Sequence, residues 1–214
     1  MTVSLDRQFF FDTVQHALFK GSLTPAQIEG MNAIFDYWDA NLATADRRWL
    51  AYILATAFHE TAYTMQPVRE TLATSDSRAV EILETAFVSG RLSWVKSPYW
   101  RPDEDGKCWL GRGLVQLTHK RNYEAMSEVT GIDLVAQPDR AMEMAPAVTI
   151  LIEGMLRGSF TSHRLCDHLN QDREDWVNAR RIVNGTDRAE KLADYAQTFF
   201  AAIRPNASAA FWPG

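Results

Sequence analysis

The sequence predicts a mainly α-helical fold with one small β element, and three observations carry that prediction. In most segments apolar residues recur at spacings of three and four, the period of an amphipathic helix. Thr24, Pro25 and Gln27 form a Thr-x-x-Gln capping signal with proline at the first helical position. The run from Trp49 to Phe58 is apolar on nearly every side, as in a helix at the centre of a core.

The same period predicts each of the helices, and its interruptions predict the turns and loops between them. Pro67 is expected to end the central helix, because proline cannot continue it and disfavours the α conformation at Gln66. From Lys96 to Leu110 prolines and Asp105-Gly106 interrupt the period, so we expect a loop or small β-hairpin there. The expected helices cover residues 7–18, 25–41, 46–65, 77–88, 119–130, 145–156, 173–183 and 187–203.

Length and composition limit the organisation and the partners. A chain of 214 residues suits one well-cored domain, which we place at 1–203, and the tail 204–214 is expected to be mobile. The 22 basic and 27 acidic residues give a net charge of −5, which offers no basic field for nucleic acid. No apolar run approaches the roughly 18 residues of a membrane span, and no secretion signal is recognisable. We expect a monomer that stays in the cytoplasm of a bacterial host until something releases it.

Candidate catalytic residues are most concentrated at His59-Glu60-Thr61, and Glu70 follows ten residues after Glu60. Glu60 falls near the end of the apolar helix, where burial and the helix dipole both penalise its ionised form, as a general acid requires. Glu70 follows Arg69 on a more polar segment, so it is expected to stay ionised as base or nucleophile. Two carboxyl groups whose surroundings give them different pKa values are typical of the active sites of glycoside hydrolases. The alternative is that an arginine satisfies Glu60 and that Glu70 is a solvated loop charge.

No metal or other cofactor is expected. His59-Glu60 resembles the start of a zinc-binding helix, but the motif needs a second histidine four positions on, where this chain has Tyr63. The remaining histidines show no ligand spacing, and two cysteines make no thiolate cluster.

Two later segments also combine glycine with short polar residues. In the first, Gly111 and Gly113 permit close backbone approach to a ligand, and Gln116, Thr118 and Asn122 follow. In the second, Arg180 to Gly185, Asn184 and Gly185 equally suit a helix stop. From the residues alone, both segments fit a structural role as well as a functional one.

Together, the three segments resemble family 19 glycoside hydrolases, which include plant-type chitinases and many bacteriophage endolysins. Phe58-His59-Glu60-Thr61 looks like the catalytic-acid segment, residues 111–123 like the substrate-cleft segment, and residues 181–185 like the late Ile-Asn-Gly segment. The resemblance implies a lysozyme-like, two-lobed helical domain with a small β-hairpin beside the cleft.

Carried over by position, the resemblance makes Glu60 the general acid and Thr118 the residue that helps hold the attacking water. The short spacing to Glu70 is similar to the endolysin-like branch and makes Glu70 the base. Ala62-Tyr63 departs from the Gly-Gly that often follows the acidic segment. The resemblance implies Gln116, Asn122 and Asn184 in sugar binding. We add His59, Trp109, Tyr123 and Arg181 as further candidate sugar-binding residues, because aromatic side chains can stack on sugar faces.

The resemblance leaves three functions to separate. The first is a peptidoglycan hydrolase that cuts β-1,4 bonds between wall amino sugars with inversion, as a bacteriolytic, antimicrobial phage endolysin would. The second is a chitinase acting on a related polymer. The third is a non-catalytic cell-wall-binding domain, which would gain nothing from a buried acid.

Overall fold

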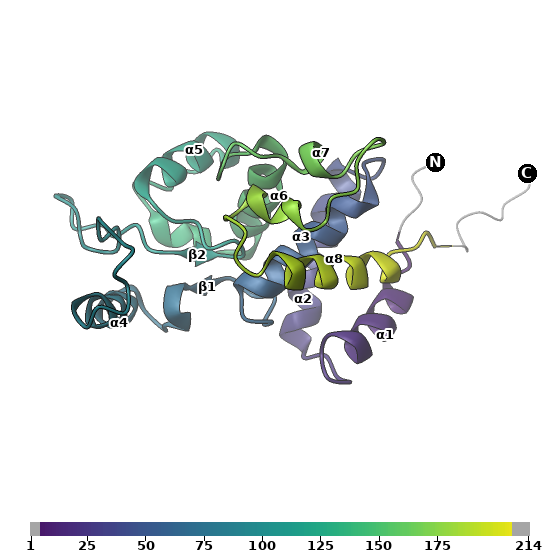
Figure 1. Cartoon of the computed structure of the whole chain (residues 1–214), viewed down its shortest axis with the longest axis horizontal. Helices are drawn as coiled ribbons and strands as arrows, with labels where there is room; N and C mark the ends of the chain where they lie inside the picture. The colour runs from purple at the N-terminus through teal and green to yellow at the C-terminus, as the bar shows by residue number, and fades with distance from the viewer. Residues whose placement is uncertain (1–4, 207–214) are drawn as a thin grey trace, which may run out of the picture. The chain divides into compact units, whose positions relative to one another are not determined.

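The computed structural model describes residues 5–206 and is mainly helical with a two-stranded antiparallel sheet, as expected (Figure 1). The chain divides into two compact units. Unit 1 comprises the chain up to Met65 and from Gly154 on, and unit 2 is Gln66–Glu153. That residues 1–203 act as a single domain stays a prediction. The elements are α1 (Arg7–Ala17), α2 (Pro25–Asn41), α3 (Arg47–Glu60), β1 (Val68–Arg69), η1 (Glu70–Leu72), α4 (Asp76–Val88), β2 (Arg112–Gly113), α5 (Lys120–Thr130), η2 (Pro138–Met142), α6 (Met144–Arg157), α7 (Leu165–His168), η3 (Asn178–Ile182) and α8 (Ala189–Ala202), where η marks a 3₁₀ helix.

Unit 1 is built around α3. Every residue of α3 from Leu50 to Phe58 is buried, which confirms the apolar run as the centre of a core. Helix α8 packs along α3 and also contacts α1 (Figure 1). The capping box of α2 forms as predicted: the Gln27 amide donates to Thr24 Oγ1, and the Thr24 amide donates to Gln27 Oε1.

Helix α3 ends at Glu60, well before Pro67, so our expectation that proline stops it was wrong. The side chain of Thr61 ends the helix instead: its hydroxyl donates to the Ala57 carbonyl and accepts from the Met65 amide. Ala62, Tyr63 and Met65 then adopt positive φ, which turns the chain sharply away from the helix axis. Glu60 is therefore the last helical residue, directly before this turn.

Unit 2 contains the small sheet, but not where we placed a hairpin. Residues 96–110 have no strand; β1 and β2 lie before and after that segment and pair antiparallel, with Val68 opposite Gly113. Since the strands are so far apart in sequence, local turn signals could not reveal them. Residues 96–110 instead contribute Trp100, Cys108 and Leu110 to a core with α4.

Two further segments differ from the prediction. The helix expected at 173–183 is only the short 3₁₀ helix η3, because Asp175 accepts from the Asn178 amide and turns the chain there. The first residues of the tail are held: Arg204 pairs with Asp6, and Leu5 forms a β-bridge with Pro205. The rest of the tail, 207–214, lies outside the described residues.

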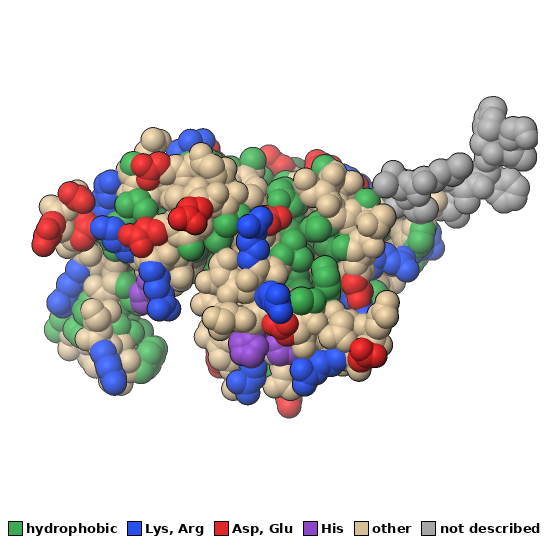
Figure 2. Space-filling view, turned by 90° about the horizontal axis from the view of Figure 1, so that it is seen from above, with side chains coloured by type: hydrophobic (Ala, Val, Ile, Leu, Met, Phe, Trp, Pro, Cys, Tyr) green, Lys and Arg blue, Asp and Glu red, His purple; other side chains and the backbone are tan. Residues whose placement is uncertain are grey.

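The surface carries charges of both signs. On the face seen in Figure 2, Lys and Arg side chains are interspersed with Asp and Glu. None of the helices between residues 5 and 206 combines the length and apolarity that crossing a bilayer requires.

Candidate active site

Glu60 is paired with a buried arginine inside unit 1. Glu60 Oε1 accepts a hydrogen bond of 2.7 Å from Arg180 Nη1, and the two side chains are 17% and 2% exposed. Arg180 Nε donates to the Asp187 carbonyl at 3.2 Å, which fixes the guanidinium plane. The guanidinium is thus held by the backbone and in turn holds one oxygen of Glu60.

Arg180 was missed as a site residue, because the sequence analysis selected its neighbour Arg181. Arg181 is exposed, and its Nε lies 3.4 Å from Asn178 Oδ1. In a 3₁₀ helix the side-chain period is three, so the residue that points inward differs from that of an α-helix. Asn184 is also exposed, and its Oδ1 accepts from the Gly185 amide. Neither side chain contacts Glu60.

His59 lies beside Glu60 at the end of α3. Its Nδ1 is buried and makes no hydrogen bond within the described residues. Burial lowers the pKa of His59; the adjacent Glu60 charge opposes this, and the Arg180 charge adds to the lowering. His59 is therefore neutral at pH 7 and leaves Arg180 as the cation that contacts Glu60.

Glu70 lies in unit 2, at the start of η1, and both of its carboxylate oxygens are held by neutral donors. Tyr99 donates its hydroxyl to Oε1 at 2.6 Å, and the Gly111 amide donates to Oε2 at 2.9 Å. The Glu70 amide donates in turn to the Gly111 carbonyl at 2.7 Å. Both oxygens therefore act as acceptors, and the two donors fix the carboxyl group in one orientation.

Tyr99 belongs to the segment where we expected a hairpin, and we did not predict it as a site residue. Burial raises the pKa of Tyr99, and the neighbouring Glu70 charge raises it further. The hydroxyl therefore stays protonated and remains a donor. The His119 ring packs edge-on against Tyr99 at 4.7 Å, and burial lowers the pKa of His119. Tyr99 thus lies between a neutral imidazole and the carboxylate.

The glycine-rich segment forms a tight loop that follows β2. Arg112 and Leu117 exchange two backbone hydrogen bonds, and Gln116 adopts a φ of 56° between them. Gln116 Nε2 donates to the Val68 carbonyl at 3.0 Å, which ties the loop to β1. Gly113 is required, because its φ is 87° and a Cβ there would lie 2.8 Å from the Ala141 carbonyl oxygen. Hydrogen bonds to β1 and to Glu70 place the loop next to that carboxylate.

Thr118 and Asn122 follow this loop, and both are partly exposed. Asn122 Nδ2 donates to the Thr118 carbonyl at 2.7 Å. The Thr118 hydroxyl itself makes no hydrogen bond with any residue between 5 and 206, so it is free to bind a water or a ligand.

Two of the proposed sugar-binding residues are buried and cannot contact a polysaccharide. Tyr123 is 0% exposed; its hydroxyl donates to the Leu110 carbonyl and accepts from Arg112 Nη1. Trp109 is 6% exposed, and its indole donates to Asp103 Oδ2 at 3.0 Å. These aromatic residues were assigned to sugar binding by residue type, whereas their side chains are part of the core of unit 2.

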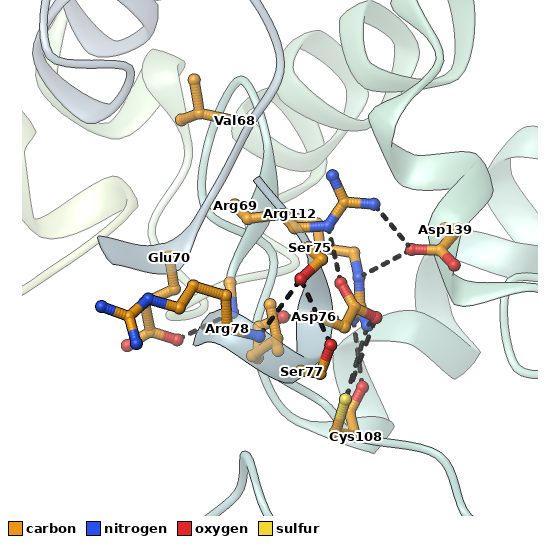
Figure 3. Close-up of polar contacts among 12 residues, drawn as sticks. Val68, Arg69, Glu70, Ser75, Asp76, Ser77, Arg78, Cys108, Arg112 and Asp139 are labelled. Atoms are coloured by element: carbon orange, nitrogen blue, oxygen red, sulfur yellow. Dashed lines mark hydrogen bonds and ion pairs between the residues drawn. The ribbon is translucent and has the colours of Figure 1, made fainter. Parts of the chain in front are cut away.

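A network of ion pairs supports the sheet that carries Glu70 (Figure 3). Arg69 and Arg112 lie directly opposite each other on β1 and β2, a like-charge pairing that would destabilise the sheet. Asp76 offsets the repulsion between the two arginines because it pairs with both of them, and Asp139 also contacts both. Burial alone would raise the pKa of Asp76, but hydrogen bonds from Arg112 and Arg69 outweigh it, and the pKa is lowered.

No residues suited to a metal come together in the part of the chain that the structure describes. No group of three or more His, Cys, Asp or Glu side chains there is arranged to hold a metal ion.

Comparison with known proteins supports the fold. No protein-family model and no curated protein sequence matches the chain. Among solved structures, the chain is similar to a bacterial family 19 chitinase, described as differing from plant enzymes, with a TM-score of 0.51 and 19% sequence identity. The similarity covers 97% of this chain and 98% of that one. The chain therefore has the fold of a family 19 chitinase.

Proposed function

We propose that this protein is a glycoside hydrolase that cuts β-1,4 bonds between the amino sugars of peptidoglycan, with Glu60 as general acid and Glu70 as general base. The observation that carries the proposal is the position of Glu60 as the last residue of the buried helix α3, where Arg180 holds one carboxylate oxygen and the other has no hydrogen bond to any described residue. The arginine that our alternative interpretation of Glu60 expected is present, so the proposal rests on the free oxygen rather than on the ion pair. The likeness in fold to a family 19 chitinase supports the same reaction class.

Glu60 is suited to deliver a proton from one defined oxygen. Because Arg180 donates to Oε1, that oxygen is an acceptor, and the acid form carries its proton on Oε2. Oε2 would protonate the leaving glycosidic oxygen as the C–O bond breaks.

Glu70 is suited to accept a proton from water. Tyr99 and Gly111 fix its plane and occupy one lone pair on each oxygen, so each oxygen keeps a second acceptor site. Water activated there would attack the anomeric carbon from the face opposite the leaving group, and the product would be inverted. The free hydroxyl of Thr118 would hold that water as a second hydrogen-bonding partner.

Chitin is the second candidate substrate, and the specific observation in its favour is that the similar solved structure is a chitinase. Peptidoglycan is favoured by the short sequence spacing between Glu60 and Glu70 and by the exposed basic residues Arg188 and Lys191, whose charges act on His59. Peptidoglycan carries carboxylates, and chitin does not.

The test is to incubate one preparation with purified peptidoglycan sacculi and with colloidal chitin, and to measure new reducing ends. We expect release from sacculi at a rate well above that from chitin, with inversion detected as the newly formed anomer by proton NMR. Faster release from chitin would make the protein a chitinase. Binding to sacculi without new reducing ends would make it a wall-binding domain.

A further inference from the structure

Three side chains of unit 1 form a cluster that the candidate active site does not use: Tyr63, Lys191 and Tyr195. Lys191 Nζ donates to the Tyr63 hydroxyl at 3.4 Å and lies 5.7 Å from the centre of the Tyr195 ring. The two tyrosine hydroxyls are 3.4 Å apart, and the rings are nearly perpendicular. We call these residues the tyrosine–lysine cluster.

Two residues of the cluster, Tyr63 and Tyr195, border an aromatic cavity of about 400 Å³ in unit 1, and Lys191 contacts Tyr63 without lining this cavity. Both tyrosines line the cavity, and Phe58 packs against both rings with centroids 4.6 and 5.0 Å away. The other lining residues include Phe19, Lys20 and Gln27, and none of the lining residues is acidic. A cavity lined by aromatic rings and polar side chains matches a sugar ring, which has an apolar face and a polar rim.

Lys191 has no counter-ion within residues 5–206. Its pKa is raised by hydrogen bonds with Tyr195 and Tyr63, and no carboxylate contributes. Asp194, one turn further along α8, forms no ion pair with it. The ammonium is exposed to solvent, is positioned by the two tyrosines, and pairs with no carboxylate of the described residues. An anionic group on a ligand would supply the missing partner.

Tyr63 is held in a costly backbone conformation while its side chain stays accessible. Its φ is 73°, in the left-handed region that favours glycine, and its side chain is 42% exposed. Gln27 Nε2 donates to the Tyr63 carbonyl at 3.0 Å and so helps to keep this conformation. A strained, exposed aromatic residue indicates a binding role better than a role in packing. Glycine at position 63 would adopt the same φ without backbone strain.

From these observations we infer that the tyrosine–lysine cluster and its cavity bind a carboxylate-bearing amino sugar, with the sugar face on Tyr63 and the carboxylate on Lys191. This deepens the proposed function and rests on it, because it gives the protein a means to distinguish peptidoglycan glycan from neutral chitin. Tyr63 lies three residues after Glu60 in the sequence, but the site includes none of the candidate catalytic residues.

The experiment measures binding in the catalytically disabled Glu60→Gln protein by titration calorimetry. The probes are a tetrasaccharide of alternating N-acetylglucosamine and N-acetylmuramic acid with free lactyl carboxylates, and chitotetraose as its neutral counterpart. Adding Lys191→Gln should weaken binding of the acidic probe roughly fivefold and leave chitotetraose unchanged. Adding Tyr63→Gly should weaken binding of the acidic probe up to about tenfold without lowering the melting temperature, because glycine accepts the positive φ.

Lys96→Gln is the matched control, because Lys96 is an exposed lysine of unit 2 outside this cavity. Equal affinity of the Lys191→Gln and Lys96→Gln proteins for the acidic probe would overturn the inference, as would an equal loss for both probes in Lys191→Gln. These outcomes are distinct from a failure of the proposed function. In that case the protein with Glu60 intact would release no reducing ends from sacculi, whatever the state of Lys191.

Discussion

The two candidate catalytic carboxylates are held in opposite ways. In unit 1, Glu60 has one oxygen bound to a buried cation, Arg180, and the other oxygen unconstrained by any contact described above. In unit 2, Glu70 has both oxygens bound, and both donors are neutral. A group that must give up a proton needs one free oxygen to carry it, whereas a group that must position water needs a fixed plane. Glu60 thus keeps one oxygen available for a proton and Glu70 has a fixed plane, and these two features are what the proposed roles of acid and base require.

The largest effect is expected for Glu60→Gln, which tests the role of Glu60 as the acid. The amide is nearly isosteric but carries no acidic proton, so turnover of sacculi should fall by ~10³-fold or more. Reducing-end release measures the loss, and an unchanged melting temperature shows that the fold is retained. Activity within tenfold of the parent would remove Glu60 as the acid.

Glu70→Gln should cost ~10²–10⁴-fold in turnover, because the amide cannot accept the proton of the attacking water. NMR of the residual product should still show inversion. If activity stays near that of the parent, the base must be sought among other acidic residues such as Glu81, Glu84 or Asp103.

Asp76→Asn tests the support of unit 2 rather than the reaction. Loss of the carboxylate leaves Arg69 and Arg112 opposed, with Arg112 buried, and should lower the free energy of unfolding by about 3 kcal/mol. Because the folded-state pKa of Asp76 is lowered, its contribution is present above the unfolded value of 3.8 and is lost as pH falls through the lower folded value.

Urea unfolding at pH 7 and at acidic pH measures the effect of Asp76→Asn. The variant should lose less of its stability than the parent as the pH falls below about 4. Parallel pH dependence of the two proteins would contradict the assignment.

Substitutions of Thr118 test whether its hydroxyl binds water or only fills space. Thr118→Val should reduce turnover roughly tenfold with little change in melting temperature, because the side chain is partly exposed and its hydroxyl has no protein partner to lose. Thr118→Ser keeps the hydroxyl and should be mild. Equal turnover in the two variants would exclude the role in holding water.

The smallest effect is expected for Tyr99→Phe, which removes one of the two donors to Glu70 but leaves the Gly111 amide. Turnover should fall several-fold and stability by about 1 kcal/mol. Steady-state kinetics should place the loss in kcat rather than in KM. A loss confined to KM would mean that Tyr99 contacts the sugar instead of orienting Glu70.

The sequence predicted the helical framework well because its signals are local. The capping box at Thr24 and the apolar run of α3 depend only on neighbouring residues, and both occur as expected. The end of α3 was predicted too late, since Pro67 is a visible signal whereas the hydrogen bonds of Thr61 depend on the turn that they stabilise. The pairing of β1 with β2 was not predictable, because it joins segments with no shared turn.

The candidate site was predictable only in part for the same reason. Glu60 and Glu70 were selected from local surroundings and resemblance, and both have specific partners in the structure. Arg180 was not selected over Arg181, since a 3₁₀ helix rather than an α-helix decides which of the two points inward. Tyr123 and Trp109 were assigned to sugar binding by residue type, but the distinction between a cleft aromatic and a core aromatic depends on burial.

The partner of Glu60 also fixes when the contacts of that carboxylate can form during synthesis. Arg180 follows Glu60 by 120 residues, which a ribosome takes roughly 6–24 s to add. All of unit 2 is translated within that interval, whereas α8, which packs along α3, is translated only after Arg180. A chain that terminates before residue 180 thus contains both glutamates, but its Glu60 lacks a partner. The order of elements along the chain therefore completes the surroundings of Glu70 before those of Glu60.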